Sequence, residues 1–248
     1  IFDNFITDIN ILSKLGISFV VVHGGGPRIK RELDKSNIQS KFIRGLRVTD
    51  KKIINIVESV LIDFNNDIVD SLKRFGTDAI SIHTKKNNII KVTPEAKELG
   101  FVGIPEKINN DLIKKILNQK QVPIVSPLGL GNDNHPYNIN GDTAAGAIAK
   151  SLKSRRLLLM TNVEGVLDKD KKLINEITST EVLKMVENNI ITEGMIPKIN
   201  TCLDAVKNGV TAVGIIDGRK QHSILFEIFS DKGSGTLIRK WKILKKWN

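Results

Sequence analysis

Unbroken apolar runs alternate with segments of helical periodicity along most of the chain. Apolar side chains recur at helical spacing through residues 1–16, and Gly16 ends that pattern. The next segment, ISFVVVH at 17–23, is an apolar run typical of a strand covered on both faces of a parallel sheet. The same criteria predict further strands at 42–50, 78–83, 89–93, 100–108, 122–129, 155–162, 211–217 and 235–240, and further helices after Pro27 and at 50–74, 109–120, 141–152, 178–189, 194–208 and 223–230.

Apolar strands that alternate with helices indicate an α/β protein. We predict a three-layer αβα sandwich with a mostly parallel, doubly wound central sheet. A chain of 248 residues is long enough for two lobes that share one continuous sheet. In such sheets ligands bind at the carboxyl ends of the strands. The segments that follow predicted strands, and are therefore the expected binding segments, are His23–Gly26, Ser126–Gly131 and Thr161–Gly165.

The segment VVVHGGGP places three consecutive glycines between a predicted strand and a predicted helix. Glycine N–H groups together with a helix N-terminus can form a cradle for an anion. The motif is neither a P-loop, GxxxxGK[ST], nor the dinucleotide fingerprint GxGxxG. A plain tight turn explains three glycines equally well, so the motif by itself leaves both interpretations open.

The chain carries a formal net charge of +11, which favours either nucleic acid or an anionic small molecule as a ligand. Its lysines are spread along the sequence and aromatic residues make up only 5%, too few for base-stacking platforms. We therefore expect no nucleic-acid partner. No apolar run reaches the roughly 20 residues of a membrane span, and no membrane association is expected. The single cysteine, Cys202, excludes an internal disulfide and suits a reducing compartment.

Three segments contribute polar residues that suit an anionic substrate. In GLRVTD, Arg47 has a planar guanidinium that matches a carboxylate, with a plain surface arginine as the alternative. In YNINGDTAAGAIA, Asn138 and Asn140 fall on one side of an extended segment. Asp142 follows at the start of a helix, where it is either a functional acid or a simple N-cap. In GMIPKIN, Lys198 lies one turn into a helix and either reaches a phosphate or faces solvent.

Together these residues suit phosphoryl transfer, which depends on positioning and charge stabilisation more than on covalent chemistry. The four histidines show no metal-ligand spacing, so we expect no metal site built from protein ligands. The serine-hydrolase motif GxSxG is absent as well.

The chain closely resembles the amino-acid kinase family in five segments, which are VVVHGGGP, GLRVTD, YNINGDTAAGAIA, TNVEGVLD and IITEGMIPKIN. The resemblance extends over about residues 1–239. The combination of GLRVTD, YNIN and GMIPK is similar to the members of the family that act on N-acetyl-L-glutamate. It implies the αβα fold of that family, with an N-terminal lobe (1–150) that binds the amino-acid substrate and a C-terminal lobe (151–248) that binds ATP.

The reaction implied by this resemblance is phosphorylation of the γ-carboxylate of N-acetyl-L-glutamate by ATP, the second step of arginine biosynthesis. Mg²⁺ is implied as a companion of the nucleotide, bound through its phosphates. A bacterial cytoplasm or a plastid is the implied location. Two alternatives remain open: a kinase of a related acidic amino acid of the aminoadipate type, and a non-catalytic amino-acid-binding regulator.

The family pattern also implies individual roles. Gly24 and Gly25 are expected beside the substrate carboxylate and the transferring phosphoryl group, with Gly25 counted among the catalytic residues. Arg47, Asn138 and Asn140 are expected to bind the rest of the substrate. Asp142 and Lys198 are the remaining catalytic residues, the acid orienting lysines and the lysine stabilising charge on the leaving side. The residues implied to line the ATP site are Asn162, Val163, Glu164, Gly165, Val166, Leu167, Ile190, Ile191 and Thr192.

Two departures from the family pattern stand out. The family's first strand carries a K-x-G-G motif, and no such motif precedes Ile1. We expect the sequence to be an incomplete gene record, inactive as it stands, with a truncated pseudoenzyme as the alternative. The second departure is Asn162, where the family usually has aspartate. We expect a small effect, since the neighbouring backbone does much of the nucleotide binding.

The C-terminal segment DGRKQHSILFEIFSDKGSGTLI resembles arginine-inhibited members of the family. His222, Glu227 and Gly233 are the implied effector site, in which Glu227 would bind the guanidinium of arginine. The resemblance also implies a homo-oligomer, either a dimer or a hexamer. A PII-type signalling protein is a candidate partner, because some relatives bind one.

Overall fold

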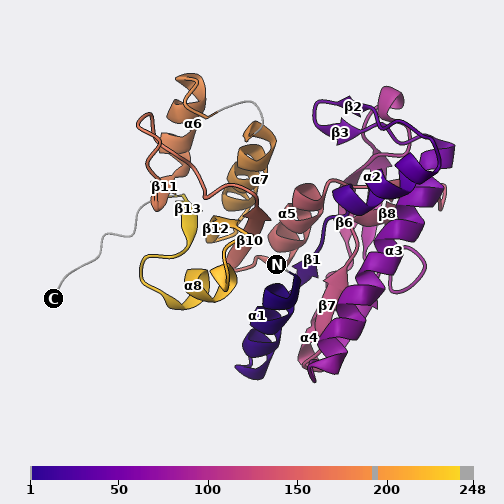
Figure 1. The fold of residues 1–248 in the computed structure, drawn as a ribbon, viewed down its shortest axis with the longest axis horizontal. Helices are drawn as coiled ribbons and strands as arrows, with labels where there is room; N and C mark the ends of the chain where they lie inside the picture. The colour runs from indigo at the N-terminus through magenta and orange to yellow at the C-terminus, as the bar shows by residue number, and fades with distance from the viewer. Residues whose placement is uncertain (1, 192–194, 241–248) are drawn as a thin grey trace. The chain divides into compact units, whose positions relative to one another are not determined.

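The computed structural model describes residues 2–191 and 195–240 (Figure 1). Its contacts divide the chain into two compact units. The first unit holds residues 9–147, and the second holds residues 1–8 and 148–248. None of the helices in the described residues is both long and apolar enough to cross a membrane.

A parallel three-stranded sheet lies at the centre of the first unit. Helices pack against it, which explains why its strands are unbroken apolar runs. The order of its strands is β1 (Val21–Val22), β7 (Val122–Val125) and β4 (Ala79–Ile82). The helices of this unit are α2 (Gly26–Lys35), α3 (Lys51–Arg74) and α4 (Asn110–Asn118), preceded by α1 (Phe2–Lys14), which begins in the second unit.

Helix α3 is the main support of this sheet. It packs against β4 and β7 on one side and against α2 on the other, through a buried cluster that includes Leu33, Val57 and Leu61. Asp50 begins the helix as its capping position predicts, because its Oδ1 accepts the N–H of Lys52 and Ile53 at 2.8 Å each.

A second, mixed sheet and a hairpin complete the first unit. The apolar run at 122–129 was expected to be one strand, and this expectation is wrong. The run divides into two strands of different sheets because Pro127 has no N–H to continue a ladder and Leu128 N–H turns back to the carbonyl of Ser126. The mixed sheet has the order β6 (Gly103–Ile108), β5 (Ile90–Pro94), β8 (Leu128–Leu130) and β9 (Pro136–Asn138), with the short helix η1 (Lys97–Leu99) between β5 and β6; the hairpin pairs β2 (Phe42–Ile43) with β3 (Leu46–Arg47).

The second unit is built on a four-stranded sheet. Strand β12 is buried along its whole length, and helices α7 and α8 pack against it. The strand order is β10 (Arg156–Thr161), β12 (Ala212–Asp217), β13 (Gly235–Arg239) and β11 (Glu176–Thr178), and β12 runs parallel to β10 and antiparallel to β13. The helices are α6 (Ser179–Glu187), α7 (Ile196–Lys207) and α8 (Ser223–Phe229), after α5 (Gly141–Leu152), which begins in the first unit.

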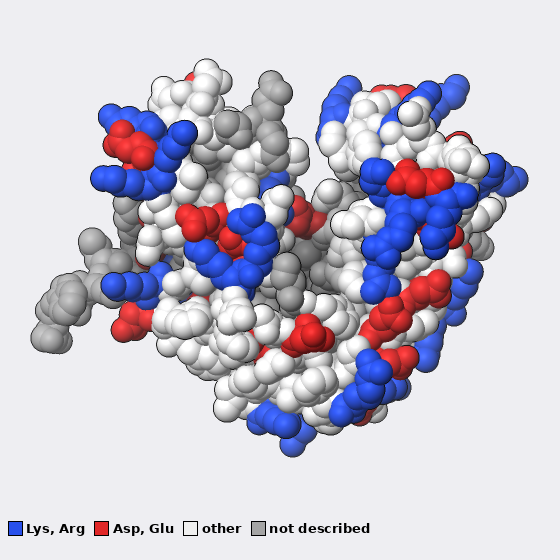
Figure 2. Space-filling model, in the orientation of Figure 1, with Lys and Arg blue, Asp and Glu red and all other residues white. Residues whose placement is uncertain are grey.

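The predicted α/β class and the alternation of helices and strands are confirmed. Within the described residues the strand pairings form a separate central sheet in each unit, and the single continuous sheet stays a prediction. The strand expected at 17–23 is also shorter, because only Val21 and Val22 form ladder pairs with β7. Figure 2 shows basic and acidic side chains intermixed on the face that it draws.

Candidate functional site

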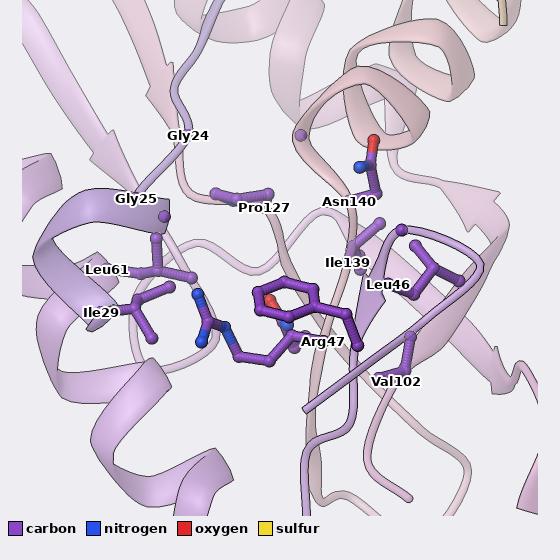
Figure 3. A pocket seen from close by; sticks show the side chains of 15 residues that line it. Gly24, Gly25, Ile29, Leu46, Arg47, Leu61, Val102, Pro127, Ile139 and Asn140 are labelled. Atoms are coloured by element: carbon purple, nitrogen blue, oxygen red, sulfur yellow. The ribbon is translucent and has the colours of Figure 1, made fainter. Parts of the chain in front are cut away.

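One pocket in the first unit brings together the glycine turn, Arg47 and both asparagines expected to bind a substrate (Figure 3). Its volume is about 190 Å³. Among the lining residues Arg47 is the only charged one. The lining comprises Gly24, Gly25, Gly26, Ile29, Phe42, Gly45, Leu46, Arg47, Leu61, Val102, Pro127, Asn138, Ile139, Asn140 and Gly141.

The glycine turn joins β1 to α2, and packing accounts for only one of its three glycines. A Cβ on Gly25 would collide with the side chain of Leu61. Cβ atoms on Gly24 and Gly26 would meet nothing within 4 Å, because both residues border the open pocket. The glycines therefore keep the N-terminus of α2 accessible, and the N–H groups of a helix N-terminus bind anions.

A second helix N-terminus lies beside this turn. Gly141 begins α5, and a Cβ on it would lie 3.7 Å from the carbonyl oxygen of His23. Asn140 caps the helix, since its Oδ1 accepts the N–H of Thr143 at 3.1 Å. The alternative that Asp142 is the N-cap is therefore wrong, and Asp142 lies in the first turn of α5. Two helix N-termini beside one pocket create positive potential there, which favours an anion.

The hairpin of β2 and β3 positions Arg47. Its two turn residues, Arg44 and Gly45, have positive φ angles of 51° and 79°, the conformation of tight hairpin turns. The Arg47 guanidinium lies over the ring of Phe42, with Cζ 4.8 Å from the ring centre, and donates a hydrogen bond to the hydroxyl of Ser40. These contacts fix the plane of the guanidinium before any ligand arrives.

Arg47 is a buried cation whose pocket contains no carboxylate. Only 9% of the residue is exposed, and its side chain extends toward Ile29 and Leu61 in Figure 3. Burial lowers the pKa of Arg47 below its ordinary value, and the negative charge of Asp34 opposes this effect. Because a buried charge is stabilised by an opposite charge, the described pocket favours a ligand with a carboxylate. The amide of Asn138, at the end of β9, lines the same pocket.

The segment expected to bind ATP forms a fixed turn in the second unit, after β10. Asn162, Val163 and Glu164 are exposed, whereas Gly165 and Val166 are buried. The Val166 N–H donates to the hydroxyl of the fully buried Thr236 at 2.8 Å. Gly165 has a φ of +148°, and a Cβ on it would lie 2.5 Å from that hydroxyl oxygen. The turn is therefore anchored by its glycine and presents its first three residues, with Leu167, to solvent.

The sequence profile of the Amino acid kinase family matches residues 1–217. The chain belongs to the amino acid kinase family. It is 55% identical over 239 residues to an acetylglutamate kinase of Pelagibacter ubique, an alignment that covers 96% of this chain and 83% of that protein.

Solved structures agree with this membership of the amino acid kinase family. A crystal structure of a protein from Streptococcus mutans UA159 superposes with a TM-score of 0.82 at 31% identity, covering 95% of this chain and 91% of that chain. The N-acetylglutamate synthase of Neisseria gonorrhoeae, complexed with coenzyme A and N-acetyl-glutamate, has a TM-score of 0.88 over 98% of this chain and 56% of that chain. At 23% identity this second likeness supports the amino acid kinase fold alone.

The remaining residues implied by the amino acid kinase resemblance lie in the second unit. Lys198 lies in the first turn of α7, just after Pro197, and is half-buried. Ile191 is buried beside α6, whereas Thr192 lies outside the described residues. Ile190 ends the turn after α6, where its N–H donates to the carbonyl of Met185. No group of three or more His, Cys, Asp or Glu residues in the described ranges is arranged to hold a metal ion.

Two of the three residues expected to bind an arginine effector lie together. A Cβ on Gly233, where φ is +66°, would lie 2.7 Å from Oε2 of Glu227. The buried Glu227 carboxylate accepts the N–H of Ser234 at 2.9 Å and lies 3.6 Å from the guanidinium of Arg156. His222, at the start of α8, contacts a different acid. Its Nδ1 lies 2.6 Å from Oδ1 of the buried Asp8, which is in α1.

Sequence reasoning missed a buried polar network directly behind the glycine turn. His23, Asn65 and Ser126 are linked by side-chain hydrogen bonds, and Ser81 donates to Asn65 at 2.7 Å. Asn65 and Ser126 are 0% exposed. One signal was present in the sequence: Asn65 interrupts the apolar face that α3 buries through Leu61 and its neighbours, and a polar residue on a buried helix face needs partners.

Asp217, at the end of β12, lies beside the turn after β10 and is held in its ionised form. Arg219 donates to the Asp217 carboxylate from its side chain, at 2.8 and 2.9 Å, and from its backbone N–H at 2.9 Å. These bonds lower the pKa of the Asp217 carboxyl to about 2, and the side-chain hydrogen bonds from Arg219 have the largest effect. The N–H of Gly218 donates to the Thr161 carbonyl at 2.8 Å, which ties this acid to the end of β10.

The Asp217 pair predicts a pH dependence of stability. Because the folded-state pKa lies below the unfolded value, this contribution is complete above about pH 4 and is lost as the pH falls through about 2. We expect Arg219→Met to lower the free energy of unfolding at pH 7 and to weaken its decrease as the pH falls through about 2. Urea unfolding at pH 7, 4, 3 and 2 measures this, with Lys220→Met as the control.

Lys220 pairs with the exposed Glu164 at 2.9 Å, so its replacement is expected to change stability by less than about 0.5 kcal/mol. The prediction fails if Arg219→Met and the wild-type protein lose stability in parallel between pH 4 and pH 2.

Proposed function

We propose that the protein transfers the γ-phosphoryl group of ATP to the γ-carboxylate of N-acetyl-L-glutamate, the reaction of the acetylglutamate kinases and the second step of arginine biosynthesis. The observation that carries this proposal is the pocket of the first unit. It combines one buried cation with two helix N-termini, which suits a small molecule with two carboxylates. The 55% identity to an acetylglutamate kinase supports the same assignment.

In this proposal Arg47 binds the α-carboxylate of the substrate. Its guanidinium is held by Phe42 and Ser40, so little side-chain freedom is lost on binding. Asn138 hydrogen-bonds the acetylated nitrogen region, and Asn140 contributes mainly by capping α5. The γ-carboxylate then lies at Gly24 and Gly25, where backbone N–H groups offset the negative charge that accumulates during transfer.

ATP is proposed to bind in the second unit along Asn162–Leu167 and Ile190–Thr192. Mg²⁺ would enter with the nucleotide and supply charge neutralisation on its phosphates. Lys198 is proposed to stabilise the charge on the transferring and leaving oxygens, and Asp142 to orient the lysines involved.

The test is turnover with ATP and N-acetyl-L-glutamate, with the acyl phosphate trapped as its hydroxamate. The protein is expressed from its own gene, and its folding is checked by circular dichroism. We expect hydroxamate formation with N-acetyl-L-glutamate, and a much lower rate with L-glutamate or N-acetyl-L-aminoadipate. Faster turnover of the aminoadipate would identify a related acidic substrate. Binding of N-acetyl-L-glutamate without any turnover would identify a non-catalytic binding protein, and either outcome refutes the proposal.

A further inference from the structure

The hydrogen bonds around His23 define which ring nitrogen carries the proton. The amide nitrogen of Asn65 donates to the carbonyl oxygen of Ile124 at 2.9 Å, which fixes the orientation of that amide. The same nitrogen lies 3.2 Å from Nε2 of His23, and an amide nitrogen can only donate. Nε2 is therefore an acceptor and carries no proton. The hydroxyl of Ser126 lies 3.3 Å from Nε2 and also 3.3 Å from the carbonyl oxygen of Leu61, so these two acceptors share its single proton.

The proton of the ring must then reside on Nδ1, which faces the glycine turn. Nδ1 lies 3.1 Å from the carbonyl oxygen of Gly24 and donates to it. In a trans peptide the carbonyl of one residue and the N–H of the next point in opposite directions. Because the ring holds the Gly24 carbonyl, the N–H of Gly25 points away from His23. Gly24 and Gly25 line the pocket, whereas His23 does not.

The ring itself is held rigidly in this arrangement. His23 is 8% exposed, and the ring of Phe64 packs edge-on against it with the centroids 5.0 Å apart. Burial, with a smaller contribution from the nearby positive charge of Arg28, lowers the pKa of His23 to about 4. A proton on Nε2 would also confront the N–H of Asn65. The imidazole is therefore neutral at physiological pH and cannot exchange its donor and acceptor nitrogens without losing bonds.

We propose that His23 is a positioning residue that orients the Gly24–Gly25 peptide so that its N–H faces the pocket and the reacting carboxylate. This inference rests on the proposed kinase function for its effect on turnover. His23 acts through the backbone and does not touch the substrate. A glycine peptide needs such a restraint, because glycine adopts many backbone conformations and the turn would otherwise rotate its N–H out of the pocket.

Two substitutions test the Nδ1 donor and the Nε2 acceptor of His23 one at a time. In His23→Asn the side-chain amide nitrogen takes the place of Nδ1, so the donor to Gly24 is kept and the acceptor for Asn65 is lost. In His23→Gln the longer side chain places its amide at the position of Nε2. The acceptor for Asn65 and Ser126 is then kept, and the donor to Gly24 is lost. Both variants remove the same aromatic packing.

We expect His23→Gln to lower kcat about 30- to 100-fold, as loss of one preorganised backbone donor does, with the KM for ATP unchanged. His23→Asn is expected to retain kcat within about 3-fold of the wild-type value. Its fold is nevertheless expected to be destabilised at least as much as that of His23→Gln. The control is His83→Gln, a buried histidine of the same unit that lies outside the pocket lining and is expected to keep normal kinetics.

Equal losses of kcat in the Asn and Gln variants, or losses that follow their melting temperatures, would overturn the proposal. A second readout does not depend on turnover. Nitrogen-15 NMR of the wild-type ring at pH 7 is expected to show a protonated Nδ1 and a bare Nε2, and faster amide exchange at Gly25 in the Gln variant only. The opposite tautomer refutes the positioning role, whereas a wild-type protein with this tautomer and no turnover refutes only the kinase function.

Discussion

Replacement of Arg47 by methionine is expected to raise the KM for N-acetyl-L-glutamate about 100-fold, equivalent to about 2.7 kcal/mol. The guanidinium is the only charged group lining the pocket, and it is already oriented by Phe42 and Ser40. Methionine keeps most of the apolar contact with the Phe42 ring and removes only the charge and the fork of donors. The KM for ATP is expected to stay within about 3-fold of its wild-type value.

Steady-state kinetics with each substrate varied in turn measures this effect. Arg44→Met is the matched control, because Arg44 lies on the same hairpin and is exposed outside the pocket lining. Arg47→Lys should give an intermediate KM, since lysine keeps the charge and loses the planar fork. A fall in kcat with an unchanged KM for N-acetyl-L-glutamate would contradict the role of Arg47 in substrate binding.

Thermal unfolding separates this effect from misfolding. A buried cation without a carboxylate in its pocket does not stabilise the ligand-free protein. We therefore expect the melting temperature of Arg47→Met, measured without substrate, to equal or exceed that of the wild-type protein. A clear decrease would mean that Arg47 supports the hairpin itself.

Gly24→Ala is expected to lower kcat/KM about 100-fold without destabilising the fold, because its methyl group would enter the pocket and meet nothing else within 4 Å. Its φ angle lies outside the left-handed region, so alanine is not strained there. We expect the free energy of unfolding to change by less than about 0.5 kcal/mol.

Gly25→Ala is the informative contrast for this prediction. Its methyl group would collide with the Leu61 side chain, so both activity and stability should fall, the latter by about 1–3 kcal/mol. Isothermal titration with N-acetyl-L-glutamate and urea unfolding measure the two quantities for both variants. Normal binding and turnover in Gly24→Ala would show that the open space beside this residue is not the substrate site.

The elements that the sequence predicted well have a local cause. Helix α3 was predictable because its apolar residues recur at helical spacing and Asp50 supplies a cap within the same few residues. The division of residues 122–129 into two strands was harder to predict, since apolar composition continues across Ser126 and Pro127. The two strands are separate because they pair with different partners. Strand β7 pairs with β4, and β8 pairs with β5.

The parts of the site that escaped prediction depend on partners distant in the sequence. The position of His23 at a strand end was evident, but its hydrogen-bond partners Asn65 and Ser126 lie 42 and 103 residues away. The choice between Asn140 and Asp142 as the cap of α5 is of a different kind. Both residue types cap helices well, and the first residue of the helix decides between them.

In the proposed function, the pocket lined by Arg47 would also explain why the substrate carries an acetyl group. Free glutamate bears an ammonium ion beside its α-carboxylate, and that cation would lie close to the Arg47 guanidinium and two helix N-termini. Acetylation converts the ammonium into a neutral amide and removes the repulsion. In the proposed function, the positive charge of Arg47 would therefore disfavour zwitterions, and electrostatics would help to keep the free amino-acid pool out of the reaction.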